Sequence, residues 1–264
     1  MTSPNPQGAG DAFQRLVALV ATLRGPDGCP WDRVQTRDSV APYLVEETYE
    51  VMDAIRSGDV AELKEELGDL LFQVLFHADI ARTDGTFDIA QVIDAIHHKM
   101  VHRHPHVFGD EVAETPEQVL KNWDAIKAAE PSKQHRESVL DGVPRSLPAL
   151  LRAHKVSKKA AKAGFDWDHA DQVWAKVHEE LDELKAALDR GDTGEAQDEL
   201  GDVMFSLVNL ARKLDLSSEE ALSATIERFY RRFTHMERHA EGPLGALTPA
   251  QWETLWARAK TSMG

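Results

Sequence analysis

Apolar residues recur along most of the chain at the three- and four-residue spacing of an amphipathic helix. One stripe contains Leu67, Leu70, Leu71, Val74, Leu75 and Ala78, and another contains Leu200, Val203, Met204, Leu207, Val208 and Ala211. This spacing places the apolar side chains on one face of a helix. The alternating patterns and β-branched clusters typical of strands are scarce. The pattern therefore predicts an all-α protein.

The helical pattern is interrupted near the middle of the chain. Residues 131–148 contain Pro131, Gly142, Pro144 and Pro148 among polar residues, which is typical of a linker. We therefore expect an N-terminal helical module over residues 11–130 and a C-terminal module over residues 149–262. Residues 2–8 are polar and contain two prolines, and we expect a short disordered tail there.

The two modules repeat one another. Adding 133 to a residue number carries Glu46, Glu47 and Glu50 onto Glu179, Glu180 and Glu183. The same offset relates the Glu-Leu-Gly-Asp segments that begin at Glu66 and Glu199. Positions 46 to 78 share 13 identities with their counterparts, whereas typical composition gives about two by chance. The chain is therefore predicted to be two tandem copies of one helical-bundle module.

Each copy contains a Glu-Glu-x-x-Glu motif, a short turn and a Glu-x-x-Asp motif. Residues at positions i and i+3 lie on one face of a helix. The segment Arg190-Gly191-Asp192 is typical of a turn that ends one helix before the next begins. The two helices would form an antiparallel hairpin with facing carboxylates. These candidate metal ligands are Glu47, Glu50, Glu66 and Asp69 in the first copy and Glu180, Glu183, Glu199 and Asp202 in the second.

Four converging carboxylates repel one another unless a cation neutralises them. An all-oxygen set suits Mg²⁺, with Mn²⁺ as an alternative, rather than zinc. One acidic motif alone is usually a solvated helix face, but two copies in register favour a metal site. A dinuclear iron centre in a helical bundle would use Glu-x-x-His, and this sequence contains no such motif.

Basic and aromatic residues follow the carboxylates in both copies. Arg228 and Arg232, like Trp256 and Lys260, are spaced four residues apart and share a helix face. The first copy offers Lys99, Arg103, Trp123 and Lys127 in the matching context. Cations that clamp phosphates, an aromatic ring that stacks on a base and a metal held by carboxylates together indicate a nucleotide polyphosphate site.

Composition narrows the choice of function. The 264 residues include 30 Lys and Arg against 45 Asp and Glu, a formal net charge of −15. Such a charge disfavours stable binding to nucleic acids or anionic membranes. We expect a cytoplasmic protein, because there is no signal-peptide pattern and no apolar run of about 18 residues. The single cysteine, Cys29, excludes an intrachain disulfide and is expected to be structural.

Further motifs give the chain a specific resemblance to a known family. They are Gly28-Cys29-Pro30-Trp31-Asp32, Glu66-Leu67-Gly68-Asp69-Leu70-Leu71-Phe72, Arg103-His104-Pro105-His106-Val107-Phe108 and Gly164-Phe165-Asp166-Trp167. From about residue 13 to residue 260, the sequence resembles the bacterial MazG family of nucleoside triphosphate pyrophosphohydrolases. The resemblance implies a homodimer in which helices of both chains complete each catalytic bundle. It also implies Mg²⁺-dependent cleavage of NTPs and dNTPs to the monophosphate and pyrophosphate.

The resemblance also implies roles for individual residues of the second module. Glu180, Glu183, Glu199 and Asp202 would hold the metal, and Glu179 would support them or orient water. The triphosphate would be contacted by Lys176, Arg228, Arg232 and Lys260, and the base or ribose by Trp256. Tyr43 occupies the position of Lys176 in the first module. The resemblance implies turnover in the second module, and this difference agrees with that expectation.

Two alternatives remain open at this point. A non-catalytic sensor or scaffold that binds Mg²⁺ and a nucleotide would carry the same motifs, and only the reaction products distinguish it from an enzyme. The histidines at 97, 98, 102, 104 and 106 could bind a metal, but Pro105 prevents regular ligand spacing. We expect that stretch to be a loop packed against the bundle. Which carboxylate is the general base does not follow from spacing.

Overall fold

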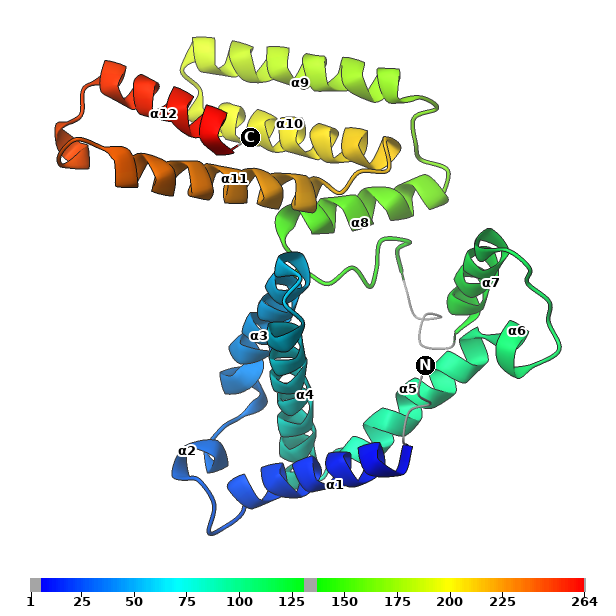
Figure 1. The fold of residues 1–264 in the computed structure, drawn as a ribbon. Helices are drawn as coiled ribbons and strands as arrows, with labels where there is room; N and C mark the ends of the chain where they lie inside the picture. The colour runs from blue at the N-terminus through cyan, green and yellow to red at the C-terminus, as the bar shows by residue number, and fades with distance from the viewer. Residues whose placement is uncertain (1–5, 131–136, 264) are drawn as a thin grey trace. The chain divides into compact units, whose positions relative to one another are not determined.

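The computed structural model describes residues 6–130 and 137–263, and all regular structure in these ranges is helical (Figure 1). This confirms the prediction of an all-α protein. The chain divides into two compact units, residues 1–131 and 132–264. Within the described residues, no helix is long and apolar enough to cross a membrane.

The helices of the two units follow one another in a similar order. The first unit contains α1 (Pro6–Leu23), α2 (Pro30–Arg33), α3 (Arg37–Ser57), α4 (Val60–Thr83), α5 (Ile89–Arg103), α6 (Pro105–Phe108) and α7 (Pro116–Ala129). The second contains α8 (Ala149–Lys162), α9 (Ala170–Arg190), α10 (Thr193–Lys213), α11 (Ser218–His239), the 3₁₀ helix η2 (Leu244–Ala246) and α12 (Pro249–Met263). The α3–α4 and α9–α10 pairs are the two repeated hairpins.

A Gly-Asp pair makes the turn of each hairpin. Gly58 and Gly191 end α3 and α9 in the left-handed conformation, with φ angles of 76° and 71°. A side chain at either position would be strained. Asp59 and Asp192 then cap the following helices by accepting hydrogen bonds from two backbone N–H groups each. These local signals fix where one helix stops and the next begins, as the spacing of the motifs predicts.

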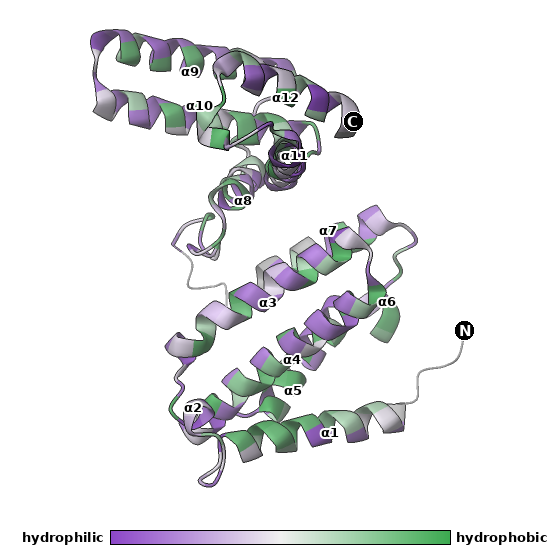
Figure 2. Ribbon diagram, turned by 60° about the vertical axis from the view of Figure 1, so that its left-hand side comes forward, coloured by the Kyte–Doolittle hydropathy of each residue, from purple (hydrophilic) through white to green (hydrophobic). Residues whose placement is uncertain are grey.

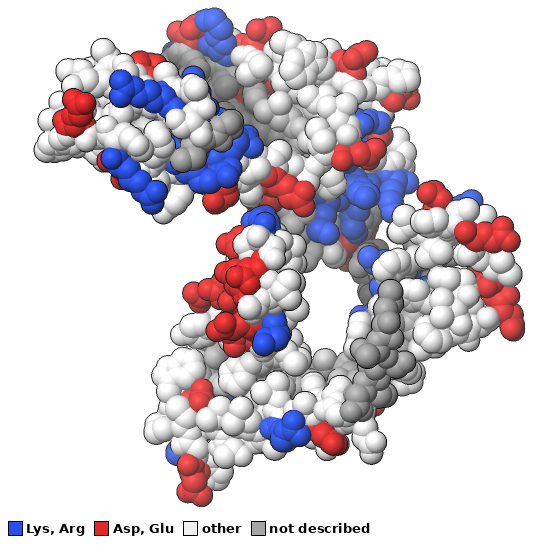
Figure 3. Space-filling view, viewed as in Figure 1, with Lys and Arg blue, Asp and Glu red and all other residues white. Residues whose placement is uncertain are grey.

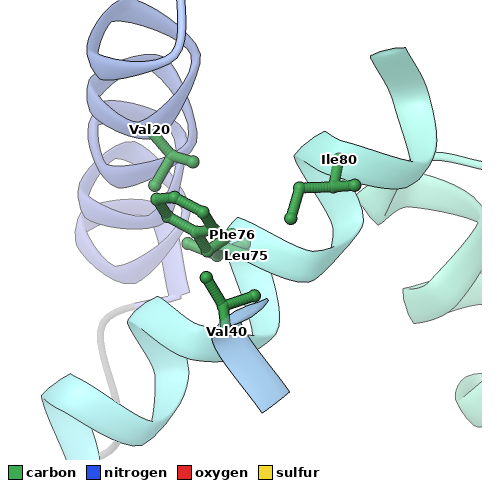
Figure 4. Packing of buried hydrophobic residues seen from close by; sticks show 5 residues of the cluster. All are labelled: Val20, Val40, Leu75, Phe76 and Ile80. Carbon is green, nitrogen blue, oxygen red and sulfur yellow. The ribbon is translucent and has the colours of Figure 1, made fainter. Parts of the chain in front are cut away.

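The hydrophobic core of the first unit lies at one end of its hairpin. Val20 of α1, Val40 of α3 and three residues of α4, Leu75, Phe76 and Ile80, pack together there (Figure 4). Helix α1 is coloured largely hydrophobic in Figure 2, in keeping with its role as the cover of this core. The acidic half of α4, which contains Glu66 and Asp69, lies outside the cluster. The hairpin therefore has a packed end and an acidic end.

The second unit is packed in two places. Val173, Val177 and Ala187 of α9 and Val203 and Val208 of α10 are buried. A separate cluster joins Met236 of α11 to Leu255 and Ala259 of α12, with Trp252 and Trp256 packed against it. This second cluster positions the helices that carry the predicted basic residues.

The structure describes parts of the N-terminal segment, of the linker and of the stretch that follows Arg103. Helix α1 begins at Pro6, so Gln7 and Gly8 are helical rather than part of a disordered tail, and residues 2–5 lie outside the described residues. The expected linker begins at the division between the units, with residues 131–136 outside the described part and residues 137–148 forming turns and irregular structure. The stretch after Arg103 forms the short helix α6, not a loop, because Pro105 starts a new helical turn.

In the first unit, a buried ion pair connects the segment that follows α1 to α4. Arg24 Nε lies 2.9 Å from Asp79 Oδ2, and the two side chains are 6% and 9% exposed. Arg82 Nη2 contacts the other oxygen of Asp79 at 2.8 Å. Arg24 also donates to the backbone carbonyl of Asp32 at 2.7 Å. The pair therefore ties the loop after α1 to the packed end of the hairpin.

Replacement of Asp79 by Asn should strongly destabilise the first unit, because it leaves the Arg24 guanidinium buried without its counter-charge. We expect a loss of about 3–5 kcal/mol in the free energy of unfolding, measured by urea denaturation with circular dichroism. Asp84→Asn is the matched control, since the Arg37–Asp84 pair is about half exposed and should contribute about 0–1 kcal/mol. Equal losses in the two variants would contradict this role for Asp79.

Candidate metal centre

The second hairpin brings three carboxylates together. Glu180 of α9 and Glu199 and Asp202 of α10 each offer an oxygen, and these oxygens lie within 4.8 Å of one another. Glu180 is 6% exposed, Glu199 is half-buried and Asp202 is exposed. The arrangement combines a buried inner ligand with an opening to solvent, which suits a cation that also contacts a dissolved substrate.

The fourth predicted carboxylate, Glu183, lies beside this group rather than in it. A hydrogen bond with Glu180 raises the pKa of Glu183, and burial and the charges of Glu199 and Glu180 add to the rise. Burial likewise raises the pKa of Glu199, with further contributions from Glu180 and Asp202. The carboxylates therefore destabilise one another's charged forms. A bound cation would relieve this repulsion, so the residues fit a divalent metal.

Lys176 already neutralises part of the acidic cluster. Its ammonium nitrogen lies 2.6 Å from Glu179 Oε1 and 2.9 Å from Glu180 Oε1. Hydrogen bonds to Glu179 and then Glu180 raise the pKa of Lys176 above its usual value. The residue predicted to reach a phosphate is thus held at the edge of the cluster, one helical turn before the acidic pair.

The first hairpin contains the equivalent cluster. Oxygens of Glu47, Glu66 and Asp69 lie within 4.8 Å of one another, and Figure 3 shows acidic side chains gathered along α3 and α4. Burial raises the pKa of Glu47 and of Glu66, and the charge of Glu50 contributes to both rises. Gln73 Nε2 donates to Glu47 Oε1 at 3.4 Å, a contact that sequence reasoning missed. Its signal was the position of Gln73, one turn after Asp69 on α4.

No lysine is available at the edge of the first cluster in the position of Lys176. Tyr43 stands there, and its ring packs edge-on against Trp31 with the ring centroids 6.0 Å apart. A tyrosine hydroxyl can donate a hydrogen bond but carries no positive charge at neutral pH. The two clusters therefore share their carboxylates and differ in the neighbouring cation.

The predicted basic and aromatic residues of the second unit are grouped on α11 and α12. The Arg232 guanidinium lies 5.8 Å from the centre of the Trp256 ring, and Phe229 packs against the same ring. Arg228 donates to Thr225 Oγ1 at 2.7 Å, and Lys260 is exposed. In the described part of the chain, neither Arg228 nor Lys260 forms an ion pair with the carboxylates. The structure thus brings Arg232 and Trp256 together and leaves the metal cluster as a separate group.

The corresponding residues of the first unit are arranged differently. Arg103 is 11% exposed and forms a two-pronged pair with Glu130, at 2.6 and 2.8 Å. Trp123 packs against His104, with the ring centroids 5.7 Å apart, while Lys99 and Lys127 are exposed. Sequence reasoning missed Glu130, which lay at the edge of the expected module. Arg103 is therefore held by a carboxylate of the first unit.

Comparison with known proteins shows that both units match the same protein family. The family model described as the MazG nucleotide pyrophosphohydrolase domain matches residues 35–108 and again residues 169–237. The chain is 44% identical to the nucleoside triphosphate pyrophosphohydrolase of Escherichia coli (strain K12), over 94% of this chain and 97% of that protein. It is 42% identical to the nucleoside triphosphate pyrophosphohydrolase/pyrophosphatase MazG of Thermotoga maritima, over 96% and 97%. A Mycobacterium tuberculosis protein also named nucleoside triphosphate pyrophosphohydrolase is 35% identical, over 98% and 72%.

Proposed function

Since the chain belongs to the MazG family of nucleotide pyrophosphohydrolases, we propose that it hydrolyses NTPs and dNTPs to the monophosphate and pyrophosphate at the carboxylates of its second unit. The protein is a nucleoside triphosphate pyrophosphohydrolase, and hence a hydrolase. The observation that carries the choice of site is the convergence of Glu180, Glu199 and Asp202 beside a lysine. Its substrates would be free nucleotides of the cytoplasm rather than nucleic acids.

The cofactor is a divalent cation, and we assign it as Mg²⁺ with Mn²⁺ as an alternative. Glu180, Glu183, Glu199 and Asp202 would hold it, because hard divalent cations prefer carboxylate oxygens. When bound, such a cation offsets the charge of the phosphates and polarises the phosphoryl group that is attacked. Glu47, Glu50, Glu66 and Asp69 would form the equivalent site in the first unit.

The general base is drawn from the acidic residues of α9. Glu179 lies next to the cluster and is held by Lys176, so its carboxylate can accept a proton without leaving the metal short of a ligand. Glu180 and Glu183 are the other candidates, because a carboxylate within hydrogen-bond reach of the attacking water can perform the same step. Lys176 keeps a third N–H donor beyond its two carboxylate contacts, and that donor would contact a phosphate oxygen.

The basic residues of α11 and α12 would bind the leaving group. Arg228, Arg232 and Lys260 would offset the charge that develops on pyrophosphate as the bond between the α and β phosphates breaks. Trp256 would stack on the base or ribose, and its contact with Arg232 holds the aromatic face and one phosphate-binding cation together. Lys99, Arg103, Trp123 and Lys127 would be the first unit's counterparts, with Arg103 constrained by Glu130.

The exposed apolar surface of the hairpins supports a homodimer. Large side chains remain exposed on α9 and α10, namely Trp174, Leu181, Leu188, Leu200, Met204 and Leu207. The first hairpin exposes Tyr43, Val45, Tyr49, Met52, Ile55, Leu67, Leu71 and Val74. Contiguous apolar faces on a helical hairpin are typical of protein interfaces. A second copy of the chain would cover them and complete each bundle around its carboxylates.

The differences between the two carboxylate clusters favour a role for the first unit other than hydrolysis. Tyr43 replaces the cation, and Arg103 is already paired with a carboxylate. A site with metal ligands but a weaker phosphate clamp can bind a metal–nucleotide complex without turning it over. We therefore assign hydrolysis to the second unit and nucleotide binding alone to the first.

Incubation with an NTP and Mg²⁺ should release pyrophosphate and the monophosphate in equal amounts. Excess chelator should abolish this release, and Mg²⁺ or Mn²⁺ should restore it, because the proposed ligands are all oxygen. Ion-exchange chromatography of the nucleotides with a phosphate assay identifies the products. Release of orthophosphate would indicate another reaction, full activity in excess chelator would exclude the carboxylate centre, and tight binding without turnover would favour a sensor.

Substitutions at matched positions of the two units should have unequal effects. Glu180→Gln should lower kcat by roughly 10²-fold or more, because it removes the buried ligand and with it several kcal/mol of transition-state stabilisation. Glu47→Gln, its counterpart, should leave most activity. Lys176→Tyr, which installs the first unit's residue, should cost about 1.5–3 kcal/mol, roughly tenfold or more in rate. A larger loss from Glu47→Gln than from Glu180→Gln would reverse the assignment of the two units.

The apolar hairpin faces should hold two chains together at micromolar concentration. Light scattering should give the mass of a dimer, and Met204→Asp should shift the protein toward the monomer with loss of activity, because a charge would be buried at the interface. Met204 is 50% exposed, so the substitution should leave the fold of one chain intact. Lys155→Asp, at an exposed position of α8, is the control. A wild-type monomer with full activity would refute the dimer.

A further inference from the structure

The second unit contains a surface cavity that hydrolysis does not use. It has a volume of about 430 Å³ and lies where α8, the end of α10 and the start of α11 meet (Figure 1). Its polar lining includes His154 and Lys158 from α8, Arg212 from α10, Ser218 from α11 and Ser217, the residue before α11. None of the carboxylates, arginines or lysines assigned to the nucleotide site lines it.

Three buried polar atoms of this lining have no hydrogen-bond partner among the described residues. They are His154 Nδ1, Arg212 Nε and Ser218 Oγ. Buried polar atoms without a partner are rare in folded proteins, and here three occur around one cavity. The terminal nitrogens of Arg212 donate hydrogen bonds to Asp166 and Asn209. These bonds fix the orientation of the guanidinium and do not involve its Nε. The residues that line the cavity therefore carry hydrogen-bonding capacity, held just beneath its surface, that no described residue uses.

The side chains around the cavity that have hydrogen bonds to donate suit a negatively charged ligand. Arg212 and Lys213 both form ion pairs with Asp166. These three side chains together carry one positive charge, and Lys158 adds another. The start of α11 contributes backbone N–H groups at the positive end of a helix of 22 residues. Burial lowers the pKa of His154, and the charges of Lys158 and Arg212 lower it further, which reflects a positive local potential.

Two carboxylates also line the cavity. Glu219 accepts a hydrogen bond from the backbone N–H of Leu151 at 3.2 Å and so caps the start of α8. Asp215 lies just after α10 with a φ of 53°, a left-handed conformation that Asp tolerates better than most residues. Their two negative charges balance those of Lys158 and of the Arg212–Lys213–Asp166 group, so the affinity for an anion rests on the unpartnered atoms of His154, Arg212 and Ser218.

The first unit provides an internal comparison at the same place in the fold. The cavity between α1, α4 and α5 has a volume of only about 50 Å³, and its lining from α1 and α5 is apolar: Val17, Val20, Ala21 and Ile89. The offset of 133 carries Asp79 onto Arg212 and Arg82 onto Asp215, so both charges are reversed. Ile89 and Ser218 are the first residues of α5 and α11. The second unit thus has a larger cavity, with polar side chains from α8 and α11 where α1 and α5 contribute apolar ones.

We propose that this cavity is a binding site for a small oxyanion of the phosphate class, separate from the carboxylate centre. Arg212 Nε and the start of α11 would donate to its oxygens, together with Ser218 Oγ, His154 and the Lys158 ammonium. Such donors are the groups that bind phosphate in proteins. Since the site joins α8 to α10 and α11, a bound anion would fasten together the helices that carry Glu199 and Arg228.

Isothermal titration calorimetry with inorganic phosphate tests the proposal. The full-length protein is kept in chelator without nucleotide and at constant ionic strength, so that neither the metal centre nor hydrolysis contributes. We expect saturable binding of one phosphate per chain. Ser218→Ile, the residue of the first unit, and Lys158→Ala should each raise Kd by about tenfold or more, as for the loss of a charge-assisted contact. Lys185→Ala removes one exposed positive charge from α9 and should leave Kd unchanged.

The same titration distinguishes this site from the nucleotide site. Lys260→Ala should not alter phosphate binding in chelator. If Lys260→Ala weakened phosphate binding and Ser218→Ile did not, the anion would lie at the nucleotide site and the proposal would be overturned. Absence of saturable binding, or binding that both cavity variants leave unchanged, would also overturn it. Circular dichroism checks that Ser218→Ile is folded, and if it is not, Lys158→Ala at its exposed position decides. Because no NTP is present, the result stands apart from the outcome of the hydrolysis assay.

Discussion

Repulsion between carboxylates on adjacent helices is the constraint around which each unit is built. Glu180, Glu199 and Asp202 offer oxygens within 4.8 Å of one another. Burial raises the pKa of Glu199, and the charges of Glu180 and Asp202 raise it further. The hairpin opposes this repulsion by burying apolar residues between α9 and α10 and by the fixed Gly-Asp turn. Lys176 relieves part of it. The fold thus holds a set of charges whose remaining repulsion a divalent cation would remove.

The two units contain the same cluster of repelling carboxylates, but the residues beside each cluster differ. In the first, Gln73 donates to Glu47, and Tyr43 packs on Trp31 where the second unit has Lys176. A neutral donor next to a carboxylate stabilises it less than an ammonium group does. The duplication has therefore kept the ligands and changed the groups around them, which is the physical basis for assigning different roles to the two units.

The same divergence affects the contact between each hairpin and the helix before it. Asp79 pairs with Arg24, directly after α1, in the first unit, whereas Arg212, at the matching position, pairs with Asp166 after α8. The reversed charge makes each hairpin complementary to its own preceding segment, because like charges would meet if the segments were exchanged. It also turns the Nε of Arg212 into a donor at the edge of a cavity.

The sequence alone determined the helices, the hairpin turns, the repetition and the identity of the facing carboxylates. These depend on local rules: periodicity of 3.6 residues, glycine in the left-handed conformation and an aspartate cap. The tertiary structure decided that Gln73 of α4 donates to Glu47 of α3, that Arg103 pairs with Glu130 across 27 residues, and that an open cavity forms beside Arg212. Local patterns cannot specify these contacts, because the partner of a long charged side chain depends on which helices pack against it and how closely.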